Sequence, residues 1–387
     1  MKKQNKTGSI GVVSATAIGV GGMMGAGLYT LLGLSANSAG VWLPVSFLIG
    51  GIVAAFSVYS YSKLGMKYPD RGGAAKFLLK EFGDGLLAGG MNVFQYIGWI
   101  ITMALYATGF AEYACQLLGK SSSGWLGKAI SIGIVIVVVA INIMGSKQVA
   151  RAQTAIIAFE LLILLSFVAV GLTKLHVPTI TSSNSGNIVG ILSAAGLLYV
   201  TYEGFGVVTN AAGSMVNPKK QLPQALFFSL GIVMVIYIVA SVVVVMTLGV
   251  QGAVANQGHV LATAGKLVLG NWGLFITSLI VCIFVVIFPL SAVGEMASLA
   301  FLLVYAMVKL GHLRIAGQTG AKRWILICSV VLNLALFALL FIQTILNHET
   351  LTWISVIALL IISFLVELAW RKKNKRNLHW LGKNSNL

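Results

Sequence analysis

The sequence predicts an all-α polytopic membrane protein, because it is rich in apolar residues, poor in charge, and periodically interrupted by short polar stretches. Of its 387 residues, 58% are hydrophobic and only 9% are charged, whereas a soluble domain carries about a quarter charged residues. The mean hydropathy is +0.94. Apolar runs of about 20 residues, the length of a helix that crosses a bilayer, recur along the whole chain. The formal net charge of +17 is therefore expected to orient the protein in the lipid bilayer, not to bind nucleic acid.

We expect eleven membrane segments within one integral-membrane domain spanning residues 1–387. The first apolar segment is too long for a cleavable signal peptide. The longest polar connections, at 63–85 and 250–271, are too short to fold as a soluble domain. The expected segments are 9–34, 41–62, 86–118, 128–145, 151–173, 188–213, 224–249, 272–288, 291–310, 323–346 and 351–370.

The distribution of Lys and Arg predicts a cytoplasmic N-terminus and a location in the cell membrane. Up to residue 270, this orientation places twelve basic residues in cytoplasmic loops and four in external loops, and basic residues favour the cytoplasmic side. The twelve are Lys2, Lys3, Lys6, Lys63, Lys67, Arg71, Lys76, Lys80, Lys147, Arg151, Lys219 and Lys220, and the four are Lys120, Lys128, Lys174 and Lys266.

The same rule fails after residue 270. If 272–288 and 291–310 each cross the membrane once, Lys309, Arg314, Lys322, Arg323 and the basic run 371–376 all lie outside. One more crossing before residue 291 would place all of them inside. The sequence is therefore expected to lack one crossing in this region.

Two expected helices contain stretches that favour a break. Gly19–Gly27 holds five glycines, and Tyr199–Gly206 combines Glu203 with two glycines. Each glycine inside a helix costs about 0.5–1 kcal/mol relative to alanine, and hydrocarbon penalises unpaired backbone groups. Such stretches either let helices pack closely or line a polar site. Because these two lie five segments apart, as in transporters built from two inverted five-helix repeats, we favour a binding site.

Four stretches, in this order, resemble the amino acid–polyamine–organocation superfamily of permeases. The resemblance covers about 8–250 and 285–370. The matching residues are Val20–Tyr29; Tyr68–Ala74 with Glu81–Gly83; Gly145–Lys147 with Ala150 and Gln153; and Tyr202–Phe205 with Asn217–Lys220 and Leu222–Ala225. The resemblance implies a 5+5 inverted-repeat fold with unwound first and sixth helices. The repeats would be 9–173 and 188–310, the second shortened, followed by two additional helices in 323–370.

The resemblance also implies a substrate site at the two breaks. Helix-start amides suit an anion on physical grounds alone. By analogy, free N–H groups of Met24, Gly25, Ala26 and Gly27 would bind an amino-acid carboxylate, and carbonyls near Gly21, Gly22, Tyr199 and Thr201 would bind its ammonium group. Tyr202 and Phe205 would shape the side-chain pocket or a gate, unless they only pack against neighbouring helices.

Two carboxylates are candidates for proton coupling. Gly206 stands where relatives often carry a carboxylate, so Glu203 either compensates for it or plays a different part. Glu160 stands where some relatives have a lysine; it would accept a proton, bind a cation, or serve only as a buried hydrogen-bonding group. Glu112 and Glu367 are expected at the interface, and Glu295 either there or along the pathway. Sodium coupling is not expected, because 279–287 lacks the Ser-Thr pair of sodium-coupled relatives.

The largest departure from the family pattern is an apparent internal deletion around the eighth and ninth helices. Leu269–Gly273 resembles the start of the eighth helix, yet Pro289–Phe301 already resembles the tenth. This departure agrees with the anomaly in the distribution of basic residues.

The sequence therefore predicts a secondary transporter of amino acids or related amines, driven by protons or by exchange. The alternative is a transport-incompetent relative that acts as a sensor or partner subunit, or is inactive through the deletion. The chain has no nucleotide-binding loop and no nucleophile–base pair, so no enzymatic activity is expected. The histidines and cysteines show no metal-ligand spacing, and no metal or cofactor is expected.

Overall fold

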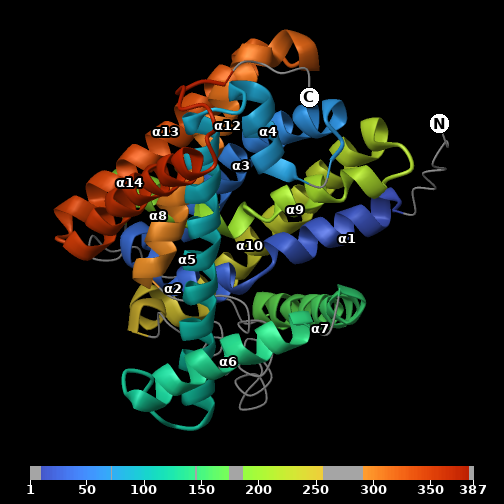
Figure 1. Ribbon diagram of the computed structural model, residues 1–387. Coiled ribbons are helices and arrows are strands. Elements are labelled where there is room, and N and C mark those ends of the chain that lie inside the picture. The colour runs from blue at the N-terminus through green and yellow to red at the C-terminus, as the bar shows by residue number, and fades with distance from the viewer. Residues whose placement is uncertain (1–9, 71, 144–145, 174–185, 256–290, 383–387) are drawn as a thin grey trace.

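The computed structural model describes residues 10–70, 72–143, 146–173, 186–255 and 291–382, and this part of the chain is helical almost throughout (Figure 1). The all-α architecture is therefore confirmed. Its elements are α1 (Val12–Met23), α2 (Ala26–Ala39), α3 (Leu43–Lys67), α4 (Gly73–Phe82), α5 (Leu86–Leu117), α6 (Trp125–Ile143), α7 (Ser146–Leu172), α8 (Ile188–Leu198), the 3₁₀ helix η1 (Tyr199–Tyr202), α9 (Phe205–Asn210), η2 (Ala212–Ser214), α10 (Pro218–Ala255), α12 (Ser291–Thr319), α13 (Arg323–Leu346) and α14 (Thr350–Lys373).

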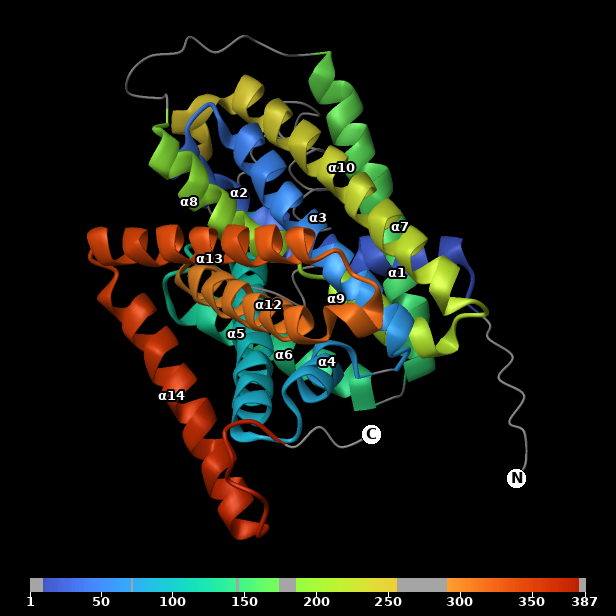
Figure 2. The same cartoon turned by 90° about the horizontal axis from the view of Figure 1, so that it is seen from above.

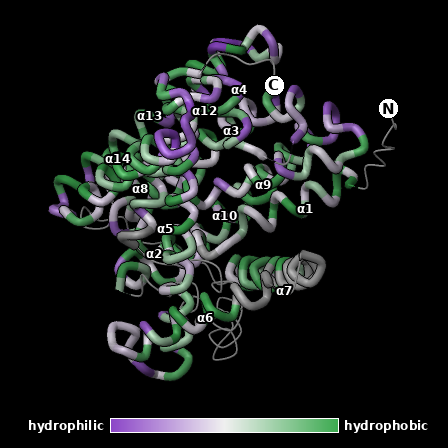
Figure 3. Tube along the Cα trace, in the orientation of Figure 1, coloured by the Kyte–Doolittle hydropathy of each residue, from purple (hydrophilic) through white to green (hydrophobic). Residues whose placement is uncertain are grey.

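The described helices confirm a multi-pass membrane protein. Seven of them are long and apolar enough to cross a bilayer, and the bent pair α1–α2 raises the number to eight. Large apolar side chains are exposed on the outer helices α13 and α14, among them Ile327, Val331 and Ile361, as expected for surfaces in contact with lipid. Hydrophilic residues gather at the end of the molecule that carries the α3–α4 connection and the C-terminus (Figure 3). We call it the loop end.

The first expected break is present. α1 ends at Met23 and α2 begins at Ala26, with a bend of 47° between them. Met24 and Gly25 connect the two helices in extended conformations. Glycine is a poor helix former. The interruption at Gly25 therefore costs little helical stability.

The second expected break takes a different form from an unwound segment. After α8, the chain tightens into η1 and continues through Glu203 and Gly204 into α9, with Glu203, Gly206 and Val207 each donating a backbone hydrogen bond three residues back. The expectation that the sixth helix unwinds is therefore wrong in detail. The helix changes to 3₁₀ geometry, which keeps most backbone groups paired.

The core is organised around α3, with α10 on one side and α12 on the other (Figure 2). α10 runs antiparallel to α3: Leu222 meets Gly65, whereas Met234 meets Gly51. α12 runs parallel to α3, because Lys309 bonds Ser57 and His312 bonds Ser60, one turn apart on both helices. The end of α10 and the start of α12 therefore lie at the same end of the molecule, opposite the loop end.

This arrangement corrects the topology expected for the C-terminal part. If 272–288 and 291–310 each crossed once, the order of the expected segments would make α12 antiparallel to α3, whereas the described helices are parallel. The segment 272–288 itself lies outside the described residues. The start of α13 is at the loop end, where the Lys322 backbone N–H donates to the Tyr59 hydroxyl. The basic run after α14 is there as well, since Arg371 and Arg376 pair with Asp84 in the α4–α5 connection.

The chain after α14 is fixed to the start of α5. The backbone N–H groups of Leu86 and Leu87 donate to the carbonyls of His379 and Trp380, both at 3.0 Å, and the Trp380 ring stacks on Phe364. Glu367, expected at the interface, is instead buried and bonded to Arg371 at 2.6 Å.

Candidate functional site

The two helix breaks are in direct backbone contact. Gly204, in the second break, lies so close to the Gly22 carbonyl and the Met23 nitrogen that a β-carbon at position 204 would overlap both. A β-carbon at Gly22 would in turn stand 3.0 Å from the Gly204 carbonyl oxygen. Farther along, Gly27 packs against Thr201. Glycine is thus required where the two backbones approach each other.

One hydroxyl group joins the two breaks. The Tyr237 hydroxyl, from α10, donates to the Met23 carbonyl at 2.7 Å and lies 3.5 Å from the Thr201 carbonyl. Met23 ends α1, so its carbonyl is among those left without a partner by the helix. Tyr237 was not identified from the sequence. Its signal was a single hydroxyl-bearing aromatic in the apolar run 224–249, which fits core packing equally well.

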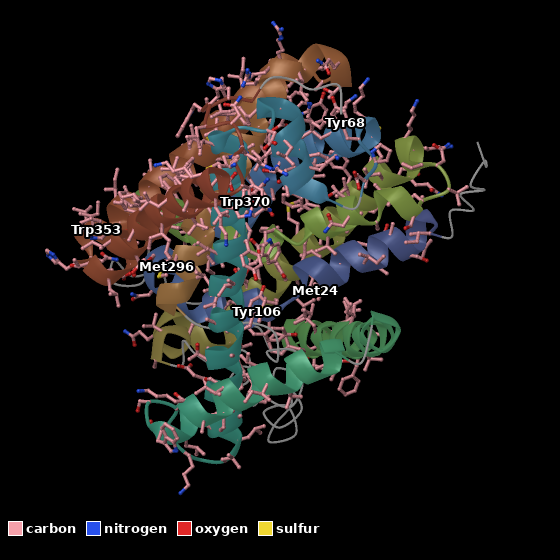
Figure 4. All side chains as sticks on the ribbon, in the orientation of Figure 1. Met24, Tyr68, Tyr106, Met296, Trp353 and Trp370 are labelled. Carbon is pink, nitrogen blue, oxygen red and sulfur yellow. The ribbon has the colours of Figure 1, made fainter. Side chains whose placement is uncertain are left out.

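The structure changes the set of backbone N–H groups that are available to bind an anion at the first break. The Met24 N–H donates to the Val20 carbonyl at 2.7 Å as the last bond of α1, so it is not free to hold a carboxylate. Gly25 is the N-cap of α2 and has no side-chain cap, and Ala26 and Gly27 open that helix. The first N–H groups of a helix lack intrahelical partners, so the available donors lie at the start of α2. Met24 lies in the middle of the molecule, as does Tyr106 of α5 (Figure 4).

Gly21 and Tyr202 face neighbouring helices. A β-carbon at Gly21 would overlap Ile157 of α7, so α1 packs closely on α7 one turn before Glu160. The side chain of Glu160 lies outside the described residues. The Tyr202 hydroxyl donates to the Phe47 carbonyl of α3 at 3.0 Å, and its ring contacts Tyr237. Tyr202 therefore ties η1 to α3.

Phe205 belongs to an aromatic cluster behind the second break. Its ring lies 5.1 Å from Tyr61 and 5.2 Å from Tyr305, centroid to centroid, and all three side chains are buried. The Tyr305 hydroxyl donates to the Glu203 carbonyl at 3.2 Å. Tyr61 and Tyr305 were not identified from the sequence, because contacts between α3, α9 and α12 become apparent only in the fold.

Glu203 is the buried carboxylate of this region. Its side chain is 3% exposed, and neither carboxylate oxygen has a hydrogen-bond partner among the described residues. Four tyrosines from three helices and η1 lie within electrostatic range of it: Tyr61, Tyr106, Tyr199 and Tyr305. A buried carboxyl group without a partner either stays protonated or requires a cation.

A cavity of about 240 Å³ connects this region with the loop end. Tyr96 and Gly72 on its wall are exposed, so it opens at the surface. It reaches Gly206, immediately after Phe205, and is lined mainly by aromatic and amide side chains. The lining residues are Tyr61, Gly72, Ala74, Ala75, Asn92, Gln95, Tyr96, Trp99, Gly206, Val207, Asn210 and Tyr305. Its volume lies somewhat below the range of about 300–1,000 Å³ for pockets that hold drug-sized ligands.

The remaining candidates do not form a site. Within the described ranges, no three His, Cys, Asp or Glu side chains come together as metal ligands. Glu112 is half-buried in α5. His312, expected in a loop, lies buried within α12, because that helix continues to Thr319.

The comparisons with known proteins identify the family. The model of the amino acid permease family matches residues 10–383. The chain belongs to this family. An uncharacterised protein of Methanocaldococcus jannaschii is 30% identical over 97% of this chain and 98% of its own length. The inner membrane transport protein YbaT of Escherichia coli is 26% identical over 95% and 97%, respectively.

A more distant relative is the branched-chain amino acid permease BcaP of Bacillus subtilis, 24% identical over 60% of this chain and 54% of its own length. The chain is thus a permease of the amino acid–polyamine–organocation superfamily, a transporter and not an enzyme.

Proposed function

We propose that the protein is a secondary active transporter that moves amino acids or related amines across the cell membrane by alternating access. The observation that carries this proposal is the backbone contact between the two breaks at Gly22 and Gly204. Interrupted helices that meet in the middle of a bundle expose backbone donors and acceptors where a polar solute can bind. The names of YbaT, an inner membrane transport protein, and of BcaP, a branched-chain amino acid permease, support transport, and the name of BcaP supports an amino-acid substrate.

The substrate would lie against both breaks. Its carboxylate would be held by the N–H groups that open α2 at Gly25, Ala26 and Gly27, where the positive end of the helix dipole favours an anion. Its ammonium group would bind carbonyls near Gly21, Gly22, Tyr199 and Thr201. Phe205 would close the site towards the cavity, because its ring contacts Tyr305 on the cavity wall.

The proposed orientation of the protein in the membrane follows from the basic residues at the loop end. We place the loop end and the N-terminus in the cytoplasm, because the loop end carries Lys63, Lys67 and the basic run 371–376. Basic residues favour the cytoplasmic side of a membrane. The two repeats, 9–173 and 188–310, would move relative to each other, with 323–370 as peripheral helices. Transport would be driven by a proton or by a counter-substrate, with Glu203 and Glu160 as coupling carboxylates.

The competing function is a permease relative that no longer transports. The alignment with the Methanocaldococcus protein extends over 429 positions, whereas this chain has 387 residues, so at least 42 positions meet gaps in this chain. That length equals about two membrane helices. The end of α10 and the start of α12 lie on the same face, which fits the loss of a helix pair, the eighth and ninth, without reversal of the helices that follow. Such a protein would act as a sensor or partner subunit, or have no activity.

Reconstitution distinguishes the two functions. Purified protein in liposomes is given radiolabelled amino acids, with and without an inward proton gradient, or with unlabelled amino acid inside. The transporter proposal predicts saturable accumulation or exchange. Uptake no greater than in protein-free liposomes, for every amino acid and amine tested, would refute it and favour the competing function.

A further inference from the structure

A buried lysine lies within the bundle, on a helix that carries neither of the two carboxylates considered above. Lys309 was expected to end the segment 291–310 as a loop charge, but α12 continues for ten residues beyond it, and its side chain is completely buried. Nζ donates to the Ser57 hydroxyl of α3 at 2.8 Å. No ion pair of the described residues includes Lys309. An ionisable group at this depth is costly and usually functional.

Lys309 is connected to the second break. The Ser57 hydroxyl shares a 2.8 Å hydrogen bond with the Tyr199 hydroxyl, and Tyr199 opens η1. The Asn333 amide of α13 donates to the same Tyr199 hydroxyl at 3.3 Å. Lys309 is therefore linked through one intervening hydroxyl to Tyr199, in the segment that changes from α to 3₁₀ geometry.

A second chain of hydrogen bonds extends from the neighbourhood of Lys309 to the loop end. One turn further along both helices, the His312 Nδ1 and the Ser60 hydroxyl are 2.7 Å apart. The other ring nitrogen, Nε2, is 2.8 Å from the Thr319 hydroxyl. Thr319 is half-buried and ends α12. The seam between α3 and α12 thus holds two sets of hydrogen-bonded side chains, one next to the second break and one towards the loop end.

We infer that Lys309 takes up and releases a proton in each transport cycle, in addition to the coupling carboxylates proposed above, with His312 and Thr319 as its route to the loop end. This inference rests on the proposed transport function. With the seam closed, the amine is neutral, because an ammonium group without an anion is strongly disfavoured in an apolar interior. When α3 and α12 separate and water enters, Nζ binds a proton from that side. The same proton leaves to water when the opposite side opens.

Protonation and conformation are coupled because each state of the seam favours one charge state of the amine. A proton on Nζ would disfavour the closed seam and, through Ser57 and Tyr199, the present geometry of η1. The elements packed against α12 carry the following titratable or charged groups: Tyr29 on α2; Tyr59, Tyr61, Lys63 and Lys67 on α3; Lys76, Lys80 and Glu81 on α4; Tyr96, Tyr106, Glu112, Tyr113 and Cys115 on α5; Tyr199 and Tyr202 on η1, followed by Glu203; Glu295, Tyr305, His312 and Arg314 on α12 itself; Arg323 and Cys328 on α13; and Glu367, Arg371, Lys372 and Lys373 on α14.

The test compares Lys309→Gln with Lys322→Gln, in which the same substitution is made at an exposed lysine. Wild type and Lys322→Gln are expected to accumulate substrate several-fold more with an inward proton gradient than without it. Lys309→Gln is expected to lose this stimulation and to keep exchange of labelled for unlabelled substrate. Proton stimulation of Lys309→Gln equal to that of wild type would overturn the inference while leaving the transport proposal intact.

A second measurement does not depend on transport. The melting temperature of detergent-purified protein is recorded between pH 6 and pH 10 for wild type, Lys309→Gln and Ser57→Ala. Because a group that binds protons differently in the folded and unfolded states makes stability depend on pH, Lys309→Gln is expected to differ from wild type in the slope of this curve, and Ser57→Ala to retain a slope. Parallel curves for wild type and Lys309→Gln would overturn the inference even if wild type transports nothing.

Discussion

The contact between Gly204 and the Gly22–Met23 backbone provides the most specific prediction. Gly204 has ordinary helical dihedral angles, φ −57° and ψ −9°, so alanine at this position meets no backbone strain. It would instead place a methyl group closer than 3.0 Å to three backbone atoms of the first break. Because those atoms belong to the main chain, no side-chain rotation can relieve the overlap.

The expected cost follows from this geometry. Restoring an ordinary carbon separation of about 3.5 Å requires the two breaks to move apart on the order of 1 Å, and such overpacking typically costs about 1–3 kcal/mol. Gly206 supplies the matched control, because a β-carbon there meets only the Tyr305 hydroxyl at 3.8 Å. Since Gly206 lies in α9, alanine there would be neutral or stabilising by up to about 1 kcal/mol.

Thermal unfolding in detergent and substrate uptake in liposomes test this prediction together. Gly204→Ala is expected to melt below wild type and to lose at least about tenfold in apparent substrate affinity, the equivalent of about 1.4 kcal/mol. Gly206→Ala is expected to melt at or slightly above the temperature of wild type and to match it in substrate affinity. If Gly204→Ala and Gly206→Ala behave alike, the breaks are not in contact as described.

Three further predictions concern stability in detergent, each read from thermal melting. Tyr237→Phe leaves the Met23 carbonyl without its hydrogen-bond donor and is expected to lower the free energy of unfolding by about 1–3 kcal/mol. A melting temperature equal to that of wild type would contradict a stabilising role of this hydrogen bond. Arg371→Met removes the buried partner of Glu367 and is expected to lower the free energy of unfolding by about 3–5 kcal/mol. Arg376→Met removes an exposed ion pair and is expected to lower it by less than about 1 kcal/mol. Equal destabilisation by the two variants would contradict this prediction. Burial raises the pKa of the Glu81 carboxyl in α4, although nearby Arg314 opposes the shift. The protonated Glu81 therefore stabilises the fold below the usual glutamate pKa of about 4.3, and this stabilisation is lost as pH rises through the raised pKa. Glu81→Gln should remove this loss of stability with rising pH, and a pH profile identical to that of wild type would contradict the prediction.

The sequence was sufficient to locate both helix breaks, because a cluster of glycines or an isolated carboxylate is unusual inside an apolar run. It did not predict the form of the second break. The choice between unwound and 3₁₀ backbone depends on partners such as Tyr305, which bonds the Glu203 carbonyl from a helix a hundred residues away. The sequence also did not predict that the Met24 N–H donates to the Val20 carbonyl. The residue at which α1 ends decides which backbone N–H groups remain free, and the sequence does not determine that residue.

The C-terminal half shows what patterns of charge and hydropathy can and cannot predict. The unequal placement of basic residues predicts an anomaly between α10 and α12, a region that lies outside the described residues. Hydropathy alone nevertheless ended the segment at Leu310 and assigned Lys309 to a loop. The helix continues because Lys309 and His312 find hydroxyl partners on α3. Such pairings between distant helices are not encoded in local hydropathy.

The central claim is that the two breaks together bind the substrate. Equilibrium binding of radiolabelled amino acids to detergent-purified wild type, Gly204→Ala and Gly206→Ala tests it most directly. We predict saturable binding by wild type and Gly206→Ala, and binding at least about tenfold weaker by Gly204→Ala. Equal affinity of all three proteins for the same amino acid would contradict the claim, because the substrate would then bind away from the contact between Gly22 and Gly204.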